Sequence, residues 1–265
     1  MSTASATSVL SQSFRRLHSQ LSWAKQSTIM ALPMNRKVVA EITSGIDNCD
    51  SVYQKTIVIR NWVKSNSVHL IDDEHDSYAF NLPQVMARLL KYAKGEGAVP
   101  HLSCGPRSYA MKAILDRLDI PNRIVDLFGL SGDHVLSVSP HTLIEVYATD
   151  IGRWILQDPD FNVVYMNVVD GQAVSLHDVL CGDVQLSFDA DGHSIENPLN
   201  LNNTVAGLFK DCGLYRMSYE GKKSKLLLNR NRFELDSSVW LGEKQITLYD
   251  YVAMRAGDFL SLIHI

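Results

Sequence analysis

The spacing of apolar residues along the chain changes from helical to alternating after about residue 119. Apolar side chains three or four positions apart, separated by polar or proline-containing breaks, predict helices over residues 10–30, 49–69, 83–92 and 106–119. Short alternating or apolar runs predict strands over residues 123–128, 141–148, 153–158 and 161–165. A further short helix is predicted over residues 174–180. Helices followed by strands in this order are typical of an α+β domain.

The chain divides into three parts on this pattern. Residues 1–48 form an N-terminal helical segment, and residues 49–180 form the core. Residues 181–265 form a C-terminal extension packed on the core. Within the core, the polar run at residues 72–76 predicts a solvated loop between two helices. A metal site around His75 is the alternative, but no other residue nearby has the spacing of a ligand.

Cys104 stands at the start of the fourth predicted helix, in the sequence Ser103-Cys104-Gly105-Pro106. Pro106 suits the first helical turn, because the N–H that proline lacks would have no partner there. A thiol in this place feels the positive end of the helix dipole and the unpaired N–H groups, which favour its thiolate form. Cys104 is therefore a candidate nucleophile. The alternative is a small buried side chain with no chemical role.

A histidine and a carboxylate meet in the hairpin predicted for residues 141–158. If the hairpin turns on two residues, His141 lies opposite Asp158. If the loop has four residues, His141 lies opposite Asp160. Either register pairs an imidazole with a carboxylate.

Cys104, His141 and the carboxylate paired with His141 are the three groups that thiol catalysis requires. The imidazole of His141 takes or shares the thiol proton of Cys104, the carboxylate orients the imidazole, and the thiolate attacks a carbonyl. The backbone N–H of Cys104 is the first donor for the developing oxyanion, and Gln84 and His101 are weak candidates for the second. His134 is an alternative base without a matching carboxylate hairpin. A zinc site made from the same thiol, imidazole and carboxylate is a further alternative.

Charge and cysteine content restrict the partners and the compartment. The net charge of −4 and the lack of a basic stripe give no reason to expect nucleic acid as a partner. No run approaches the roughly twenty apolar residues of a membrane span. The four cysteines are far apart and form no Cys-x-x-Cys pair, so we expect reduced thiols and a cytoplasmic protein. An organelle transit peptide is the alternative for the Ser-rich segment that precedes Glu41, the first acidic residue.

Three segments of the chain, within about residues 50–165, resemble the transglutaminase-like superfamily. The segment Ser-Cys104-Gly, its helix and Leu118-Asp-Ile-Pro-Asn-Arg123-Ile-Val are similar to "G-x-C … L-G-I-P-A-R-x-V". The segment His141-Thr-Leu-Ile-Glu-Val-Tyr is similar to "H-A-W-V-E-V-Y", and Trp154-Ile-Leu-Gln-Asp158-Pro is similar to "W-x-x-x-D-P". Two residues depart from the family pattern: Ser103 replaces a glycine and Leu143 replaces an aromatic residue.

The resemblance implies a papain-like α+β core, in which a helix that begins at the nucleophile packs on an antiparallel sheet. It implies that Cys104 is the nucleophile, His141 the base and Asp158 the orienting acid, and it favours Asp158 over Asp160. The superfamily contains proteases, amidases, peptide N-glycanases, amide synthases and members that have lost catalysis. The fold is therefore implied more strongly than the reaction.

We expect a cysteine-dependent acyl-transfer enzyme, a transglutaminase-like cysteine hydrolase or acyltransferase. Its thiolate would attack an amide, ester or thioester, and the acyl group would pass to water or an amine. The expected substrate is a peptide, an amide or an acyl thioester, brought free or by an acyl-carrier or protein partner, and no cofactor is expected. The alternative is a catalytically inactive binding or scaffold protein on the same fold. An arylamine acetyltransferase is less favoured, because no Arg-Gly-Gly precedes Cys104.

Overall fold

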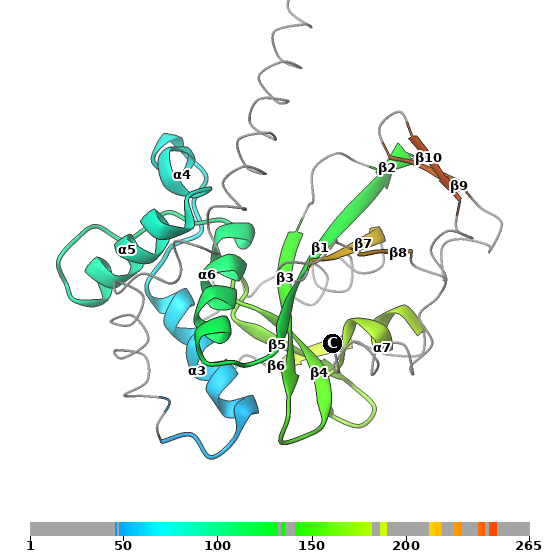
Figure 1. Cartoon of the computed structure of the whole chain (residues 1–265), viewed down its shortest axis with the longest axis horizontal. Coiled ribbons are helices and arrows are strands. Elements are labelled where there is room, and N and C mark those ends of the chain that lie inside the picture. Colours follow the sequence, from blue (N-terminus) through cyan, green and yellow to red (C-terminus); the bar gives the residue numbers. More distant parts are fainter. Residues whose placement is uncertain are drawn as a thin grey trace, which may run out of the picture.

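The computed structural model shows an α+β protein, with helices packed beside a largely antiparallel sheet (Figure 1). It describes residues 46, 48–131, 134–135, 141–181, 186–189, 212–218, 225–228, 238–241 and 244–247. The helix predicted over residues 10–30 lies outside these described residues. Within them, no helix has the length and apolar character needed to cross a membrane.

Five helices have named bounds in the described parts of the chain. They are α3 (Val52–Ser65), α4 (Asp73–Tyr78), α5 (Leu82–Ala93), α6 (Cys104–Arg117) and α7 (Leu176–Cys181). Helices α3, α5, α6 and α7 confirm the helices predicted from the apolar spacing, with ends shifted by a few residues. The solvated loop predicted at residues 72–76 is wrong, because this polar run forms most of α4. Asp72 caps α4 by accepting a hydrogen bond from the His75 N–H at 2.9 Å, and acidic residues fill the first turn, where the helix dipole favours them.

The strands form one sheet in which every pairing except one is antiparallel. The strands are β1 (Asn122–Ser131), β2 (His134–Val135), β3 (His141–Ala148), β4 (Arg153–Asp158), β5 (Val163–Asn167), β6 (Leu186–Asp189), β7 (Cys212–Ser218), β8 (Lys225–Leu228), β9 (Ser238–Leu241) and β10 (Lys244–Thr247). The spatial order is β10-β9-β2-β1-β3-β4-β5-β6, and β7 also pairs with β1 and carries β8. The pairing of β2 with β9 is parallel. Strands β6 to β10, which come from the C-terminal extension, therefore join the same sheet as the core strands.

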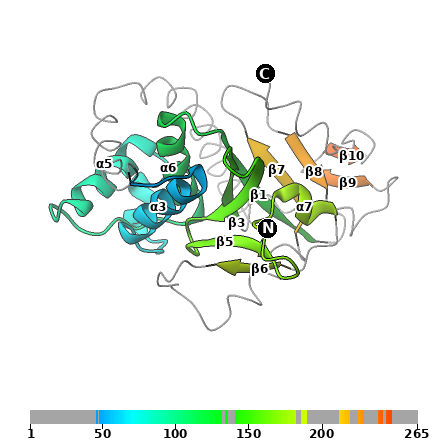
Figure 2. The same cartoon turned by 90° about the horizontal axis from the view of Figure 1, so that it is seen from below.

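Helix α6 is the central element of the helical layer, because it packs against β1 and β3 on one side and against α3 and α5 on the other. Figure 2 shows α3, α5 and α6 together beside the strands. The packing is apolar, and its fully or nearly fully buried members include Ile59, Val63, Leu89, Ala110, Met111, Ile114, Leu115, Ile124, Ile144 and Val146. The buried side of α6, which carries Ala110, Met111, Ile114 and Leu115, therefore belongs to the core of the domain.

The two ends of α6 are set by local backbone chemistry. At the start, Ser103 occupies the N-cap position with extended backbone, but its side chain makes no capping hydrogen bond. The third helical position is Pro106, which has no N–H to be capped. At the other end, Asp119 has a φ of 54°, in the left-handed region that terminates helices, and Pro121 follows. The Ser103 side chain is thus available for a contact outside the helix.

The β3–β4 hairpin has the register of a four-residue loop. Ile144 lies opposite Gln157, and Val146 lies opposite Ile155. This register, one of the two considered from the sequence, directs His141 towards Asp160 rather than Asp158. The described β3–β4 ladder ends at the pair of Ile144 and Gln157, however, because β4 ends at Asp158 and the chain then turns.

A buried ion pair joins β1 to β3 inside this sheet. Arg123 and Glu145 face each other across the two strands, both are fully buried, and their side chains are ion-paired. The Arg123 guanidinium also lies 3.9 Å from the centre of the Trp154 ring. The other oxygen of Glu145 accepts a hydrogen bond from the Leu176 N–H at 2.7 Å, at the start of α7. The pair therefore holds two strands and a helix in one arrangement.

Replacing Arg123 by Met is expected to lower the free energy of unfolding by about 3–5 kcal/mol, because it leaves the Glu145 carboxylate buried without its cation. The matched control is Arg153→Ala, which removes a partly exposed pair with Asp178 and should cost at most about 1 kcal/mol. Urea denaturation followed by circular dichroism measures both. Equal losses in the two variants would contradict the role assigned to the buried pair.

Candidate active site

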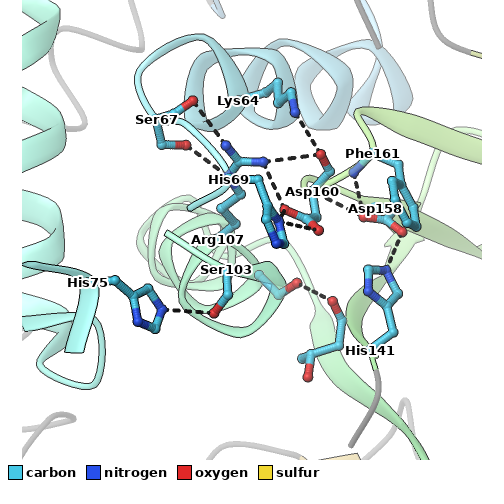
Figure 3. Close-up of polar contacts among 12 residues, drawn as sticks. Lys64, Ser67, His69, His75, Ser103, Arg107, His141, Asp158, Asp160 and Phe161 are labelled. Carbon is cyan, nitrogen blue, oxygen red and sulfur yellow. Dashed lines mark hydrogen bonds and ion pairs between the residues drawn. The ribbon is translucent and has the colours of Figure 1, made fainter. Parts of the chain in front are cut away.

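The three residues predicted to act together come from three different elements. Cys104 is the first residue of α6, His141 the first residue of β3 and Asp158 the last residue of β4. The Nε2 atom of His141 lies 2.6 Å from Oδ2 of Asp158, so the predicted imidazole–carboxylate pair is present (Figure 3). Both side chains are buried. The hydrogen-bonded carboxylate is therefore Asp158, although the strand register points His141 towards Asp160.

The Asp158 carboxylate is held by four hydrogen bonds. Its Oδ1 atom accepts from the N–H groups of Asp160 at 2.9 Å and Phe161 at 3.0 Å. Its Oδ2 atom binds His141 and also accepts from the Tyr165 hydroxyl at 2.8 Å. Burial acts to raise the pKa of Asp158, but the charge of His141 and these hydrogen bonds lower it below its ordinary value. Asp158 is thus a fixed, ionised partner for the imidazole.

Tyr165 supports this carboxylate as a permanent donor. Its burial, followed by the charge of Asp158, raises the pKa of the Tyr165 hydroxyl well above its ordinary value. The hydroxyl therefore stays protonated and donates to Oδ2 of Asp158. Tyr165 lies on β5, the strand that pairs with β4 next to Asp158.

His141 interacts with both the Asp158 carboxylate and the Cys104 sulfur. An ionised carboxylate only accepts hydrogen bonds, so Nε2 of His141 carries the proton shared with Asp158, and Nδ1 is the ring nitrogen left for the thiol. Burial alone lowers the pKa of His141, but Asp158 and the Cys104 sulfur, through charge and hydrogen bonding, raise it well above its ordinary value. The Phe161 ring stacks on the imidazole with centres 4.9 Å apart, which fixes its plane.

Cys104 itself is a free thiol and is partly exposed to solvent. Among the described residues, nothing accepts a hydrogen bond from the backbone N–H of Cys104 or of Gly105. These donors lie at the start of α6, where the helix dipole is positive. A negatively charged oxygen next to the sulfur would therefore find backbone donors in place.

One face of α6 is attached to the elements that carry the other two residues. Arg107 and Ser108 follow Cys104 by three and four positions, so the three side chains share a face of the helix. The Ser108 hydroxyl donates to the backbone oxygen of Thr142, next to His141, at 2.9 Å. Arg107 is fully buried, and its Nη1 atom lies 2.8 Å from Oδ1 of Asp160.

Asp160 is the residue through which α6 is attached to the turn after β4. Its carboxylate binds Arg107 and also Nδ1 of His69, at 2.8 Å. Its backbone oxygen accepts from Lys64 Nζ at 2.8 Å (Figure 3). The backbone N–H of the same residue donates to Asp158. The sequence alternative in which Asp160 is the partner of His141 is therefore wrong, because the Asp160 carboxylate is bound by Arg107 of α6 and by His69, which lies in the loop after α3.

The remaining candidates from the sequence are placed elsewhere. His134 lies in β2, and its side chain is outside the described part of the structure. The ring of His101, considered as an oxyanion donor, binds Asp72 at 2.8 Å, and Gln84 is exposed at the start of α5. No three His, Cys, Asp or Glu side chains among those described converge as metal ligands. The zinc alternative for the thiol, imidazole and carboxylate therefore has no support in this geometry.

Sequence reasoning missed three residues around this site and gave a fourth, Asp160, a different role. The predicted residues are held in place by four others that are not part of the predicted triad: Phe161, Tyr165, and the pair of Arg107 and Asp160. One signal was present in the sequence: a cation in the first turn of a helix opposes the dipole, which indicates that Arg107 has a specific anionic partner. Nothing in the sequence alone indicated that the aromatic side chains of Phe161 and Tyr165 would turn towards His141 and Asp158.

Replacing Asp158 by Asn is expected to lower the pKa of His141 markedly, because the carboxylate charge that raises it is lost while burial remains. Asp116→Asn is the control, since the Asp116 carboxylate pairs with Lys112 at 2.9 Å. Proton–carbon correlation spectra of the histidine rings, recorded over a pH series, measure the shift. An unchanged His141 titration in the Asp158 variant would contradict the assigned coupling.

Comparison with known proteins adds no family to this geometry. The chain matches no model of a protein family, no curated protein and no solved structure. A function for the site is therefore argued from its own residues.

Proposed function

We propose that the protein is a cysteine-dependent acyl-transfer enzyme with Cys104 as nucleophile, His141 as acid and base, and Asp158 as the residue that orients His141. The observation that carries this proposal is the state of His141. Its Nε2 atom is bound to a buried carboxylate, while its pKa is raised by both Asp158 and the Cys104 sulfur. An imidazole placed between a carboxylate and a thiol is the arrangement that activates a thiol nucleophile.

The acylation step follows from these positions. The Cys104 thiolate forms a bond to the carbonyl carbon of the substrate, and the carbonyl π electrons move to the oxygen. The backbone N–H groups at the start of α6 stabilise this oxyanion. The oxyanion then collapses, the bond to the leaving group breaks, and His141 donates its Nδ1 proton to that group. The products are a thioester on Cys104, a neutral His141 and the released amine, alcohol or thiol.

The second half of the cycle releases the acyl group. Water or an amine attacks the thioester carbon, and neutral His141 takes the proton of the attacking group. The carbon–sulfur bond breaks, and Cys104 leaves as the thiolate beside a protonated His141. Hydrolysis needs access for water, whereas transfer to an amine needs a site that excludes it. The proposal therefore includes both a hydrolase and an acyltransferase.

The fold proposed for this core is papain-like and related to the transglutaminase-like superfamily. The order of Cys104, His141 and Asp158 on a helix start and two adjacent strands supports this proposal. The buried pair of Arg123 and Glu145 supports it further, because both residues fall within the segments that resemble the family. We propose a peptide, amide or acyl-thioester substrate and a cytoplasmic location, in line with the charge and cysteine content.

A second candidate function is a binding or scaffold protein that keeps these residues without catalysis. The features that favour it are the buried positions of His141 and Asp158, which a purely structural pair would share. A scaffold has no need of a thiol that forms a covalent acyl intermediate. The two functions therefore differ in acylation of Cys104.

The activated ester p-nitrophenyl acetate tests the proposal. Acetylation of Cys104, measured by mass spectrometry and by a burst of p-nitrophenolate, is expected in the unaltered protein. Cys104→Ala should abolish the burst. His141→Ala should slow it by about 100-fold or more, the contribution typical of a positioned acid and base.

Cys49→Ala provides the matched control, because Cys49 is the other cysteine that the structure describes without a disulfide, and it lies outside this site. Its removal should leave the burst unchanged. If Cys104 is acetylated no faster than Cys49, this result would contradict the proposed enzymatic function and favour the scaffold function.

A further inference from the structure

A second histidine reaches the start of α6 from the helical layer. His75 on α4 is buried, with a side chain that is 3% exposed. Its Nε2 atom lies 3.0 Å from the hydroxyl oxygen of Ser103, and its Nδ1 atom lies 3.0 Å from Oδ1 of Asp76. Ser103 directly precedes Cys104 and is partly exposed. The mechanism described above uses none of these three residues, although their chain of contacts ends next to the nucleophile.

Helix α4 is built to hold His75 in this place. The segment that leads to Ser103 is tied to α4 by Tyr78, whose hydroxyl accepts from the His101 N–H at 2.6 Å. The ring of His101 binds Asp72, the N-cap of α4, at 2.8 Å. Asp72 in turn accepts from the N–H of His75. The position of His75 relative to Ser103 is therefore fixed from both ends.

Ser103 differs from the other N-cap residues of this helical layer. The N-cap side chains of α3, α4 and α5 each accept a hydrogen bond from their own helix, whereas the Ser103 side chain does not. Its hydroxyl is turned to His75 instead. Figure 3 shows His75 and His141 on opposite sides of Ser103 in that view. The two histidines thus approach the start of α6 from different elements, α4 and β3.

We propose that the Ser103 hydroxyl, oriented by His75 and Asp76, is a side-chain donor to the oxyanion formed on the acyl carbon bound to Cys104, beside the backbone N–H groups of α6. This inference rests on the proposed function and completes it, because the backbone donors of α6 otherwise act without a side chain. The tetrahedral carbon carries the oxyanion and the leaving group on different bonds. His141 donates its proton to the leaving group, so the donor to the oxyanion has to lie on another side of the sulfur.

The hydrogen bonds of His75 define how the hydroxyl is presented. Asp76 as a carboxylate accepts the proton on Nδ1. For the hydroxyl proton of Ser103 to be free for the substrate, Nε2 of His75 has to donate to the Ser103 oxygen, and this direction of the hydrogen bond is part of the proposal. Ser103 directly precedes Cys104, and consecutive α-carbons lie about 3.8 Å apart, so the hydroxyl and the sulfur start from adjacent backbone positions. Ser103 is thus assigned as a catalytic residue, and His75 and Asp76 as positioning residues.

Two reagents separate this role from activation of the thiol. Acetylation by p-nitrophenyl acetate forms an oxyanion and depends on donors to it. Alkylation by iodoacetamide forms the sulfur–carbon bond as the carbon–iodine bond breaks, and no oxyanion arises. Ser103→Ala should therefore slow acetylation of Cys104 by about 100-fold or more, the loss found when one oxyanion donor is removed. The same variant should alkylate Cys104 at the rate of the unaltered protein.

Three further variants provide controls. Ser103→Thr keeps the hydroxyl and should retain fast acetylation. Ser77→Ala removes an exposed hydroxyl on α4, which donates to Glu74 at 2.6 Å, and should change neither rate. His75→Ala should slow acetylation, and adding it to Ser103→Ala should cause little additional loss, because both changes remove the same donor.

Each contrary result has its own meaning. If Cys104 reacts with neither reagent in the unaltered protein, the proposed function fails, and this inference fails with it. If acetylation is fast and Ser103→Ala leaves it fast, only the assignment of Ser103 fails. Equal losses of acetylation and alkylation in Ser103→Ala would show a structural role, and an acetyl group mapped to Ser103 would make it a nucleophile. Both of these results would overturn the assignment.

Discussion

The buried ion pair between Arg107 and Asp160 is the contact on which the geometry of the site depends. Both side chains are almost entirely removed from water, and the two other nitrogens of the guanidinium bind Ser67 at 3.0 Å. Removing a charge from water costs several kcal/mol unless partners replace the lost hydration, so this cluster permits few other arrangements. Arg107 lies one turn after Cys104, and Asp160 lies two residues after Asp158. The pair therefore fixes the position of Cys104 relative to that of Asp158.

This constraint connects the packing of the domain with its proposed chemistry. The turn that carries Asp160 also supplies two N–H groups to Asp158 and the ring that stacks on His141. Holding a reactive group in place before the substrate arrives removes much of the entropic cost of the reaction. The contact between Ser103 and His75 extends the same principle to the other side of the nucleophile. Residues that never touch the substrate thereby decide where the reactive atoms stand.

Most helices and the four central strands of the core, with their candidate chemical residues, could be predicted from the sequence, whereas the residues that support the site could not. Apolar spacing identified the helix that begins at Cys104, and alternation identified the hairpin that brings His141 to a carboxylate. The strand register could not decide between Asp158 and Asp160. The Asp160 carboxylate is ion-paired with Arg107, which lies on a helix more than fifty residues away in the chain. Helix α4 was missed because its short polar sequence has no apolar period, and a single cap together with tertiary contacts stabilises it.

The measurement that tests the central claim most directly is the rate of iodoacetamide alkylation of Cys104 as a function of pH, with Cys49 in the same chain as the internal reference. The account predicts that Cys104 reacts much faster than Cys49 at pH about 6, where an ordinary thiol is almost fully protonated. It also predicts that His141→Ala abolishes this advantage and leaves Cys49 unchanged. Reaction of Cys104 that rises with pH as that of an ordinary thiol does, with or without His141, would contradict the account.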